Sequence, residues 1–117
     1  DDGRVMPYGT MGGEGQPQTQ AAVFTRYARF GQGLQQAVSA PRWLLGRTWG
    51  SETTSLKLES RFDPALVDQL KAAGHDVEVL AEAYSDTMGH AGALVRHAHG
   101  VIEGAADPRS DGAVAAA

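Results

Sequence analysis

The chain has 117 residues, of which 42% are hydrophobic and 21% are charged, and its formal net charge is −4. These totals fit one modest globular domain and give no electrostatic drive toward nucleic acid. The chain contains no cysteine, which excludes disulfides and thiolate metal sites within it but does not decide its compartment. No apolar run approaches the ~20 residues that a membrane span requires.

Short strands and short helices are expected to follow one another along the chain. The pair Asp2-Gly3 is typical of a tight hairpin turn, because glycine adopts positive φ without steric cost. Strands are favoured where apolar residues alternate with polar ones or form short runs, and helices where they recur every three to four residues. We expect strands at residues 4–8, 42–45 (a strand or an extended packing segment), 55–59, 76–80, 91–96 and 101–105, and helices at residues 18–30, 34–40 and 64–73.

Two details sharpen this pattern. The strict alternation of residues 55–59 (SLKLE) predicts a half-exposed strand. Asp63 is a good helix N-cap with Pro64 at the first helical position, and Gly74 is expected to end that helix. The order of segments indicates an α+β fold in which helices cover an antiparallel or mixed sheet, within a single domain over residues 1–117.

The most distinctive stretch is residues 9–18, GTMGGEGQPQ, between the first expected strand and the first expected helix. Four of its first seven residues are glycine. Glycine allows positive φ and the close approach of another group. A glycine-rich turn ahead of a helix also points backbone N–H groups outward, where they suit an oxyanion or a carboxylate. Taken alone, such a turn favours a plain strand-to-helix connection.

This stretch resembles the Gly-Gly loop of the gamma-glutamyltranspeptidase family. Residues 40–43 (APRW), 46–50 (GRTWG) and 106–112 (ADPRSDG) resemble further motifs of that family, in the same order. The resemblance covers nearly the whole chain, as the C-terminal part of the family's small (beta) subunit. It implies an N-terminal-nucleophile hydrolase, cut autocatalytically into two chains, with a four-layer αββα sandwich of which this chain would form part.

The resemblance implies an enzyme that cleaves a small amide through a threonine acyl-enzyme and passes the acyl group to water or to an amine. The chain begins with Asp1 and its threonines are internal, so the catalytic threonine is expected upstream, and so is a strand before the turn at residues 2–3. We therefore expect the chain alone to be inactive. Its expected partners are the large subunit and the N-terminal part of the small subunit, in the bacterial cytoplasm or periplasm, with a homo-oligomer of heterodimers left open. The alternative is a non-catalytic folding or oligomerisation module, or a degenerate homologue.

The family assigns its oxyanion hole to the paired glycines, which here are Gly12 and Gly13. In the better-known transpeptidases, Ser and an apolar run follow these glycines, whereas here the sequence EGQPQ follows. This departure favours the amidohydrolase-like branch, which includes oxamate amidohydrolase, over gamma-glutamyl specificity. Glu14 and Gln16 are candidates for contact with the polar end of the substrate, with a solvated loop role weighed equally.

Three arginines and one aspartate are further candidates. Arg42 and Arg109 match family arginines associated with maturation and activity. Because guanidinium groups form rigid bidentate pairs with carboxylates, we favour structural ion pairs with Asp107 or Asp111 and an indirect effect on the site. Arg47 is a candidate for holding a small anionic substrate such as oxamate, although a packing role is favoured.

No metal or cofactor is predicted. His97 and His99 would face one side of a strand, as metal ligands can, but no third ligand is near in sequence and a solvated turn is favoured. His90 is interpreted as a core or interface residue. The aromatic side chains expected in a core are Trp43, Trp49 and Phe62.

Overall fold

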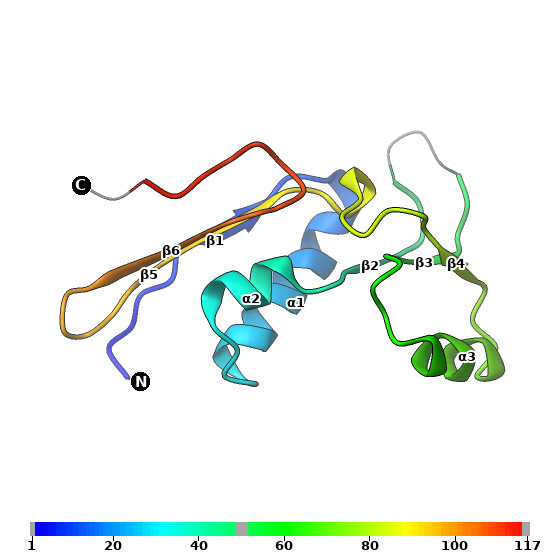
Figure 1. The fold of residues 1–117 in the computed structure, drawn as a ribbon, viewed down its shortest axis with the longest axis horizontal. Coiled ribbons are helices and arrows are strands. Elements are labelled where there is room, and N and C mark those ends of the chain that lie inside the picture. Colours follow the sequence, from blue (N-terminus) through cyan, green and yellow to red (C-terminus); the bar gives the residue numbers. More distant parts are fainter. Residues whose placement is uncertain (1, 49–51, 116–117) are drawn as a thin grey trace.

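The computed structural model describes residues 2–48 and 52–115, which form two three-stranded sheets lying one after the other along the molecule (Figure 1). The first sheet is antiparallel and has the order β1-β5-β6. The second has the order β2-β3-β4, with β2 antiparallel and β4 parallel to β3. The strands are β1 (Tyr8–Thr10), β2 (Trp43–Leu45), β3 (Leu56–Leu58), β4 (Val77–Val79), β5 (Ala91–Arg96) and β6 (Ile102–Ala106).

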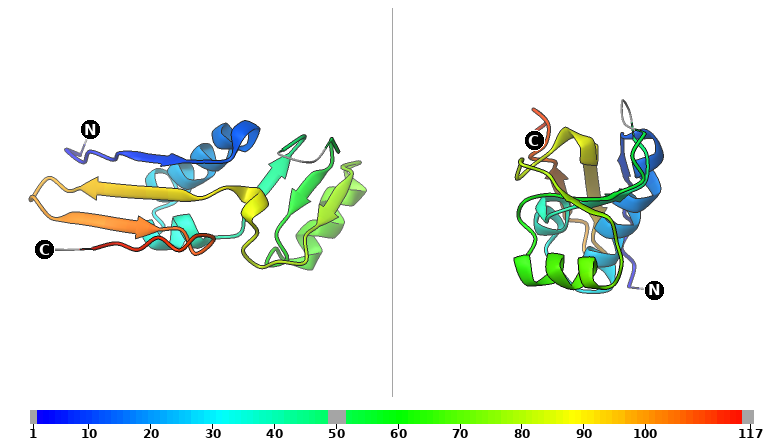
Figure 2. Two further views of the ribbon diagram at one scale, coloured as in Figure 1. Left: turned by 90° about the horizontal axis from the view of Figure 1, so that it is seen from above. Right: turned by 90° about the vertical axis from the view of Figure 1, so that its right-hand side faces the viewer.

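Helices cover one face of each sheet (Figures 1 and 2). The helical segments are α1 (Gln16–Ala28), α2 (Leu34–Ser39), α3 (Pro64–Ala72) and the 3-10 turns η1 (Gly13–Gly15) and η2 (Asp86–Met88). Helices α1 and α2 pack on the first sheet, where Val23, Leu34, Val38 and Val95 are buried together. Helix α3 packs on the second sheet. No helix within the described residues is long and apolar enough to cross a bilayer.

The expected α+β class is confirmed, and each expected helix is present. Asp63 caps α3 as predicted, because its side chain accepts a hydrogen bond from the backbone N–H of Ala65 at 2.9 Å. The first strand lies later than expected. Residues 5–10 follow β5, with Val5 paired to Arg96, but the regular ladder begins only at Tyr8. Pro7 lacks an N–H, which explains the interruption.

The prediction of a half-exposed strand at residues 55–59 is wrong, because all five residues are buried. Strand β3 is the central strand of its sheet, and its polar side chains find partners inside the protein. The Lys57 ammonium donates to the Gly46 carbonyl oxygen at 3.1 Å and to Ser55 Oγ at 3.2 Å. Alternation therefore marks two different buried faces here, one apolar and one hydrogen-bonded.

Candidate functional site

The glycine loop, residues 11–15, leaves β1 and enters α1 through the η1 turn. Gly12 and Gly13 have φ angles of 135° and 55°, which L side chains rarely adopt. The loop is closed by backbone hydrogen bonds from Gly15 N to Gly12 O and from Gln16 N to Gly13 O. Glycine is therefore required at both positions by the shape of this connection.

The glycine loop rests on a second segment, residues 85–91, which we call the backing segment. A Cβ atom on Gly12 would lie 3.3 Å from the Cα of Gly89. The backbone N–H of Met11 donates to the carbonyl oxygen of His90 at 3.0 Å. On its other side the loop packs on β2, since a Cβ on Gly15 would lie 2.9 Å from Leu44 Cδ1. The backbone of the loop is thus fixed from two sides.

The N–H groups of Gly12 and Gly13 have no hydrogen-bond acceptor among residues 2–48 and 52–115. Gly12 is half-buried and Gly13 is exposed, so an external group can reach them. Two adjacent backbone donors on a rigid turn can stabilise negative charge on an oxygen atom that is placed between them.

Behind the backing segment lies a buried ion cluster made of Arg42, Glu59, Asp107 and Arg109. Arg42 Nη2 pairs with Asp107 Oδ2 at 2.5 Å, and Arg109 Nη1 pairs with Asp107 Oδ1 at 3.0 Å. Arg109 also forms a bidentate pair with Glu59, from Nε at 2.6 Å and from Nη2 at 2.5 Å. Two cations and two anions balance, which is what allows them to be buried together.

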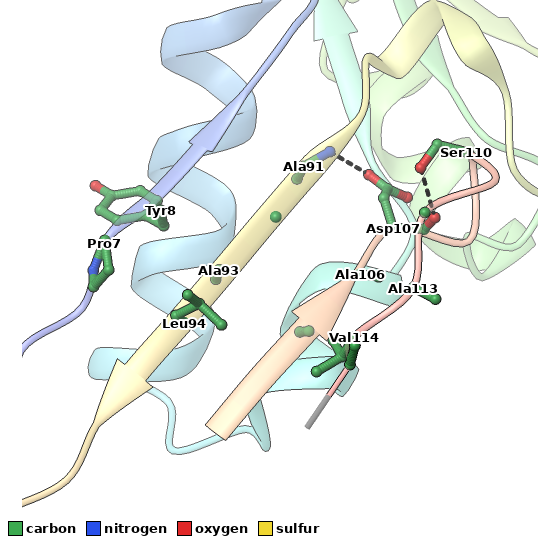
Figure 3. Close-up of a pocket in the computed structure, with 14 residues that line it drawn as sticks. Pro7, Tyr8, Ala91, Ala93, Leu94, Ala106, Asp107, Ser110, Ala113 and Val114 are labelled. Atoms are coloured by element: carbon green, nitrogen blue, oxygen red, sulfur yellow. Dashed lines mark hydrogen bonds between the residues drawn. The ribbon is translucent and has the colours of Figure 1, made fainter. Parts of the chain in front are cut away.

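Asp107 is the acceptor that joins this cluster to the first sheet. Besides its two arginines, it accepts hydrogen bonds from the backbone N–H groups of Ala91 at 2.6 Å and Arg109 at 3.0 Å, the former drawn in Figure 3. Burial alone would raise the pKa of Asp107. The backbone donors and the Arg42 guanidinium outweigh burial, so the pKa lies below its ordinary value.

Burial lowers the pKa of both arginines, but their carboxylate partners leave them with net shifts in opposite directions. Burial and the like charge of Arg109 lower the pKa of Arg42, against the opposing effect of Asp107. Burial also acts to lower the pKa of Arg109, but its hydrogen bond and charge interaction with Glu59 raise it above the ordinary value. Arg109 is therefore the more strongly paired of the two cations.

The structure thus brings three of the candidate residues, Arg42, Asp107 and Arg109, into one cluster. Asp111, the other partner considered for the arginines, is exposed and lies outside it. Glu59 was missed in the sequence, where it closes a strand that was expected to be half-exposed. No local signal in the alternating sequence of residues 55–59 indicated its burial.

The three candidates for substrate contact lie on the surface. Glu14 is exposed in the η1 turn, Gln16 is exposed at the start of α1, and Arg47 is exposed just after β2. Gln18 connects α1 to the end of β2. Its side-chain amide accepts a hydrogen bond from Leu45 N at 2.8 Å and donates one to Leu45 O at 3.0 Å. Their roles in substrate contact stay predictions.

The histidines and aromatic residues have local partners. His97 stacks on His99, with ring centroids 5.4 Å apart, and its Nε2 lies 3.1 Å from a Glu103 carboxylate oxygen. His90 is partly exposed and lies 3.1 Å from Asp86 rather than in the core of the described residues. Trp43 and Phe62 pack against the core of the second sheet, as predicted, whereas Trp49 lies outside the described residues.

Comparison with protein families and curated proteins identifies the relatives of this chain. The family model for gamma-glutamyltranspeptidase matches residues 1–117. The chain is 65% identical over 115 residues to the oxamate amidohydrolase proenzyme of Klebsiella pneumoniae, covering 98% of this chain and 22% of that protein. It is 51% identical over 106 residues to the glutathione hydrolase-like YwrD proenzyme of Bacillus subtilis, covering 91% and 20%. The chain therefore spans about a fifth of the length of these relatives.

Solved structures share the fold. The cephalosporin acylase from Bacillus halodurans superimposes with a TM-score of 0.82 and 31% identity, over 93% of this chain and 19% of that one. The transpeptidase enzyme CapD from Bacillus anthracis has a TM-score of 0.80 over all of this chain and 66% of its own, and at 22% identity this likeness concerns the fold alone. The expectation that the chain forms part of an N-terminal-nucleophile hydrolase fold is confirmed. The chain belongs to the gamma-glutamyltranspeptidase family.

Proposed function

We propose that this chain is the C-terminal portion of an amide hydrolase or acyltransferase, and that its glycine loop supplies the oxyanion hole. The nucleophile would come from a segment outside residues 1–117, in keeping with the length of the curated relatives, which are both named proenzymes. A hydroxyl of that segment would attack the amide carbonyl, the amine would leave, and water would release the acyl group.

The observation that carries this proposal is a pair of backbone donors on a fixed turn that find no acceptor within residues 2–48 and 52–115. When the carbonyl carbon becomes tetrahedral, its oxygen gains negative charge, and the N–H groups of Gly12 and Gly13 are available to receive it. One such donor contributes about 3–4 kcal/mol of transition-state stabilisation when it is held in place beforehand. The packing of the loop on Gly89 and Leu44 provides that rigidity.

For the substrate, we infer a small anionic amide of the oxamate type. The supporting observation is 65% identity to a protein named as an oxamate amidohydrolase proenzyme. Oxamate offers a carboxylate and an adjacent amide. The exposed guanidinium of Arg47 suits the carboxylate, and Glu14 or Gln16 can accept from the amide N–H groups. A gamma-glutamyl amide is the second candidate, since another relative is named glutathione hydrolase-like.

Parallel assays of the complete protein test the substrate proposal. We expect kcat/KM for ammonia release from oxamate to exceed that for nitroaniline release from gamma-glutamyl-p-nitroanilide. Residues 1–117 produced alone serve as the control and should release neither product, because the proposed nucleophile lies outside them. A higher kcat/KM for the anilide would move the substrate to the second candidate. No turnover of either amide by the complete, folded protein would favour a non-catalytic module.

A further inference from the structure

Glu59 is buried one residue beyond β3, and both of its carboxylate oxygens are occupied. Oε1 accepts from the backbone N–H of Ser85 at 2.9 Å and from Arg109 Nε at 2.6 Å. Oε2 accepts from Arg109 Nη2 at 2.5 Å, from the backbone N–H of Arg42 at 2.9 Å and from Arg61 Nη2 at 3.3 Å. One carboxylate thus joins groups from four separate parts of the chain.

These contacts connect Glu59 to the start, the middle and the end of the backing segment. The segment is also held from α1, because Thr19 Oγ1 donates to the Met88 carbonyl oxygen at 3.2 Å. Glu59 itself binds Ser85 at the start of the segment. The backbone N–H of Arg42 donates to Glu59. In the middle of the segment, Arg42 Nη1 donates to the carbonyl oxygens of Met88 at 3.3 Å and Gly89 at 3.0 Å. At the end, Ala91 N donates to Asp107, which pairs with both arginines of the cluster.

The backing segment in turn sets the position of the glycine loop. Gly89 has a φ of 69°, and a Cβ there would collide with the carbonyl oxygen of Met11. Gly89 also lies against Gly12, as described above. With backbone packed this closely against backbone, a shift of the backing segment must move the loop and its N–H groups.

We propose that Glu59 is a positioning residue for the oxyanion hole, acting on Gly12 and Gly13 through the backing segment and the arginines of the ion cluster. This inference rests on the proposed function. Glu59 touches no substrate in this scheme. It acts by holding two backbone donors in the geometry that the developing charge requires.

The test variant is Glu59→Gln in the complete protein. The amide keeps the size of the side chain but removes its charge and replaces one acceptor oxygen with an NH₂ group that would face N–H donors. The Arg109 guanidinium would lose its bidentate partner. We expect kcat for oxamate hydrolysis to fall by about 10²-fold, the size of effect that a misplacement of order 1 Å produces. KM should change little, because ground-state contacts with the substrate are untouched.

Val67→Ala is the control for a loss of stability without a change at the site. Val67 lies on α3 and is buried where this helix packs on the second sheet. Its truncation should lower the unfolding midpoint and leave kcat close to the wild-type value. If kcat falls equally in Val67→Ala and Glu59→Gln at equal loss of stability, general destabilisation explains the effect and the positioning role is wrong.

A double-variant cycle with Gly12→Ala tests whether Glu59 acts through the loop. If it does, the double variant should lose about as much kcat as Gly12→Ala alone, because the oxyanion hole is already displaced. If the two losses multiply, Glu59 acts by another route and the inference is overturned. If Gly12→Ala itself leaves kcat unchanged, the oxyanion assignment fails, and the inference fails with it. If only Glu59→Gln leaves kcat unchanged, the inference alone fails.

Ser85→Pro provides a second route should Glu59→Gln fail to fold. It removes the backbone N–H that donates to Glu59 and leaves the carboxylate and its arginines in place. It also removes the Ser85 hydroxyl, which accepts from Thr87 N, so Ser85→Ala, which removes the hydroxyl alone, is its control. The φ of Ser85, −90°, is near the range of proline. A fall in kcat beyond that of Ser85→Ala, at little-changed KM, would support the inference, and a kcat equal to that of Ser85→Ala would overturn it.

Discussion

Replacing Gly12 with alanine is expected to lower kcat of the complete enzyme by about 10²–10³-fold, the effect of losing one oxyanion-hole donor. The added methyl would lie 3.3 Å from Gly89 Cα, on backbone with a φ of 135° that L residues rarely adopt. The loop must move to relieve both conflicts, and the N–H groups of Gly12 and Gly13 move with it. The measurement is the steady-state rate of ammonia release from oxamate.

Gly74→Ala is the matched control for this experiment. Gly74 also has a positive φ, 94°, but lies after α3, and an added Cβ there would meet no atom of the described residues within 4 Å. This variant carries a similar backbone strain without touching the loop, so its kcat should remain near that of the wild type. A Gly12→Ala enzyme that keeps wild-type kcat would show that the glycine loop does not bind the oxyanion.

Asp107→Asn is expected to destabilise the protein by about 3–5 kcal/mol, the cost of breaking a buried ion pair from one side. The substitution leaves Arg42 and Arg109, both buried, with Glu59 as the one remaining carboxylate of the cluster. It also replaces an acceptor of four hydrogen bonds with an amide that has one acceptor oxygen. Urea unfolding of the complete protein measures the difference.

The effect of Asp107→Asn should depend on pH in a defined direction. The pKa of Asp107 is lower in the folded protein than its ordinary value near 3.8. Ionised Asp107 therefore contributes stability that is complete above that value and is lost as the pH falls through the folded pKa. The difference between wild type and variant should be constant near neutral pH and shrink below about pH 4.

Asp68→Asn is the control, because Asp68 is exposed on α3. We expect that change to alter stability by less than about 0.5 kcal/mol. An Asp107→Asn variant as stable as this control would mean that the buried ion cluster contributes little to the folded state.

Local sequence patterns predicted most of the fold. Helical spacing of apolar residues marked α1 and α3, and Pro41 marked the end of α2 to within one residue. The cap formed by Asp63 and Pro64 placed the start of α3 at Pro64, where the helix begins. The glycine turn could also be predicted from local sequence, because a glycine-rich segment between a strand and a helix is typical of a tight turn with positive φ. What lies behind that turn was not visible, because Gly89 is distant from Gly12 in the sequence.

The buried ion cluster shows where local patterns fail. Glu59 reaches Ser85, 26 residues away, and Arg109, 50 residues away. The alternation of residues 55–59 predicted one solvent-exposed face and one buried face. A sequence does not distinguish a buried polar residue from an exposed one, so the burial of both faces could not be predicted. The cluster forms only when three segments of the chain meet in the fold. The central place of Glu59 in it could therefore be identified only from the structure.

The proposed function rests on the claim that this chain completes an enzyme whose nucleophile lies elsewhere. The most direct test is to express the complete coding sequence, purify the product, and determine its intact mass and N-terminal sequences. The claim predicts two polypeptides, of which the smaller begins with threonine and contains the sequence of residues 1–117 near its C-terminal end. A single uncut polypeptide, or a smaller one that begins with a residue without a nucleophilic side chain, would contradict it.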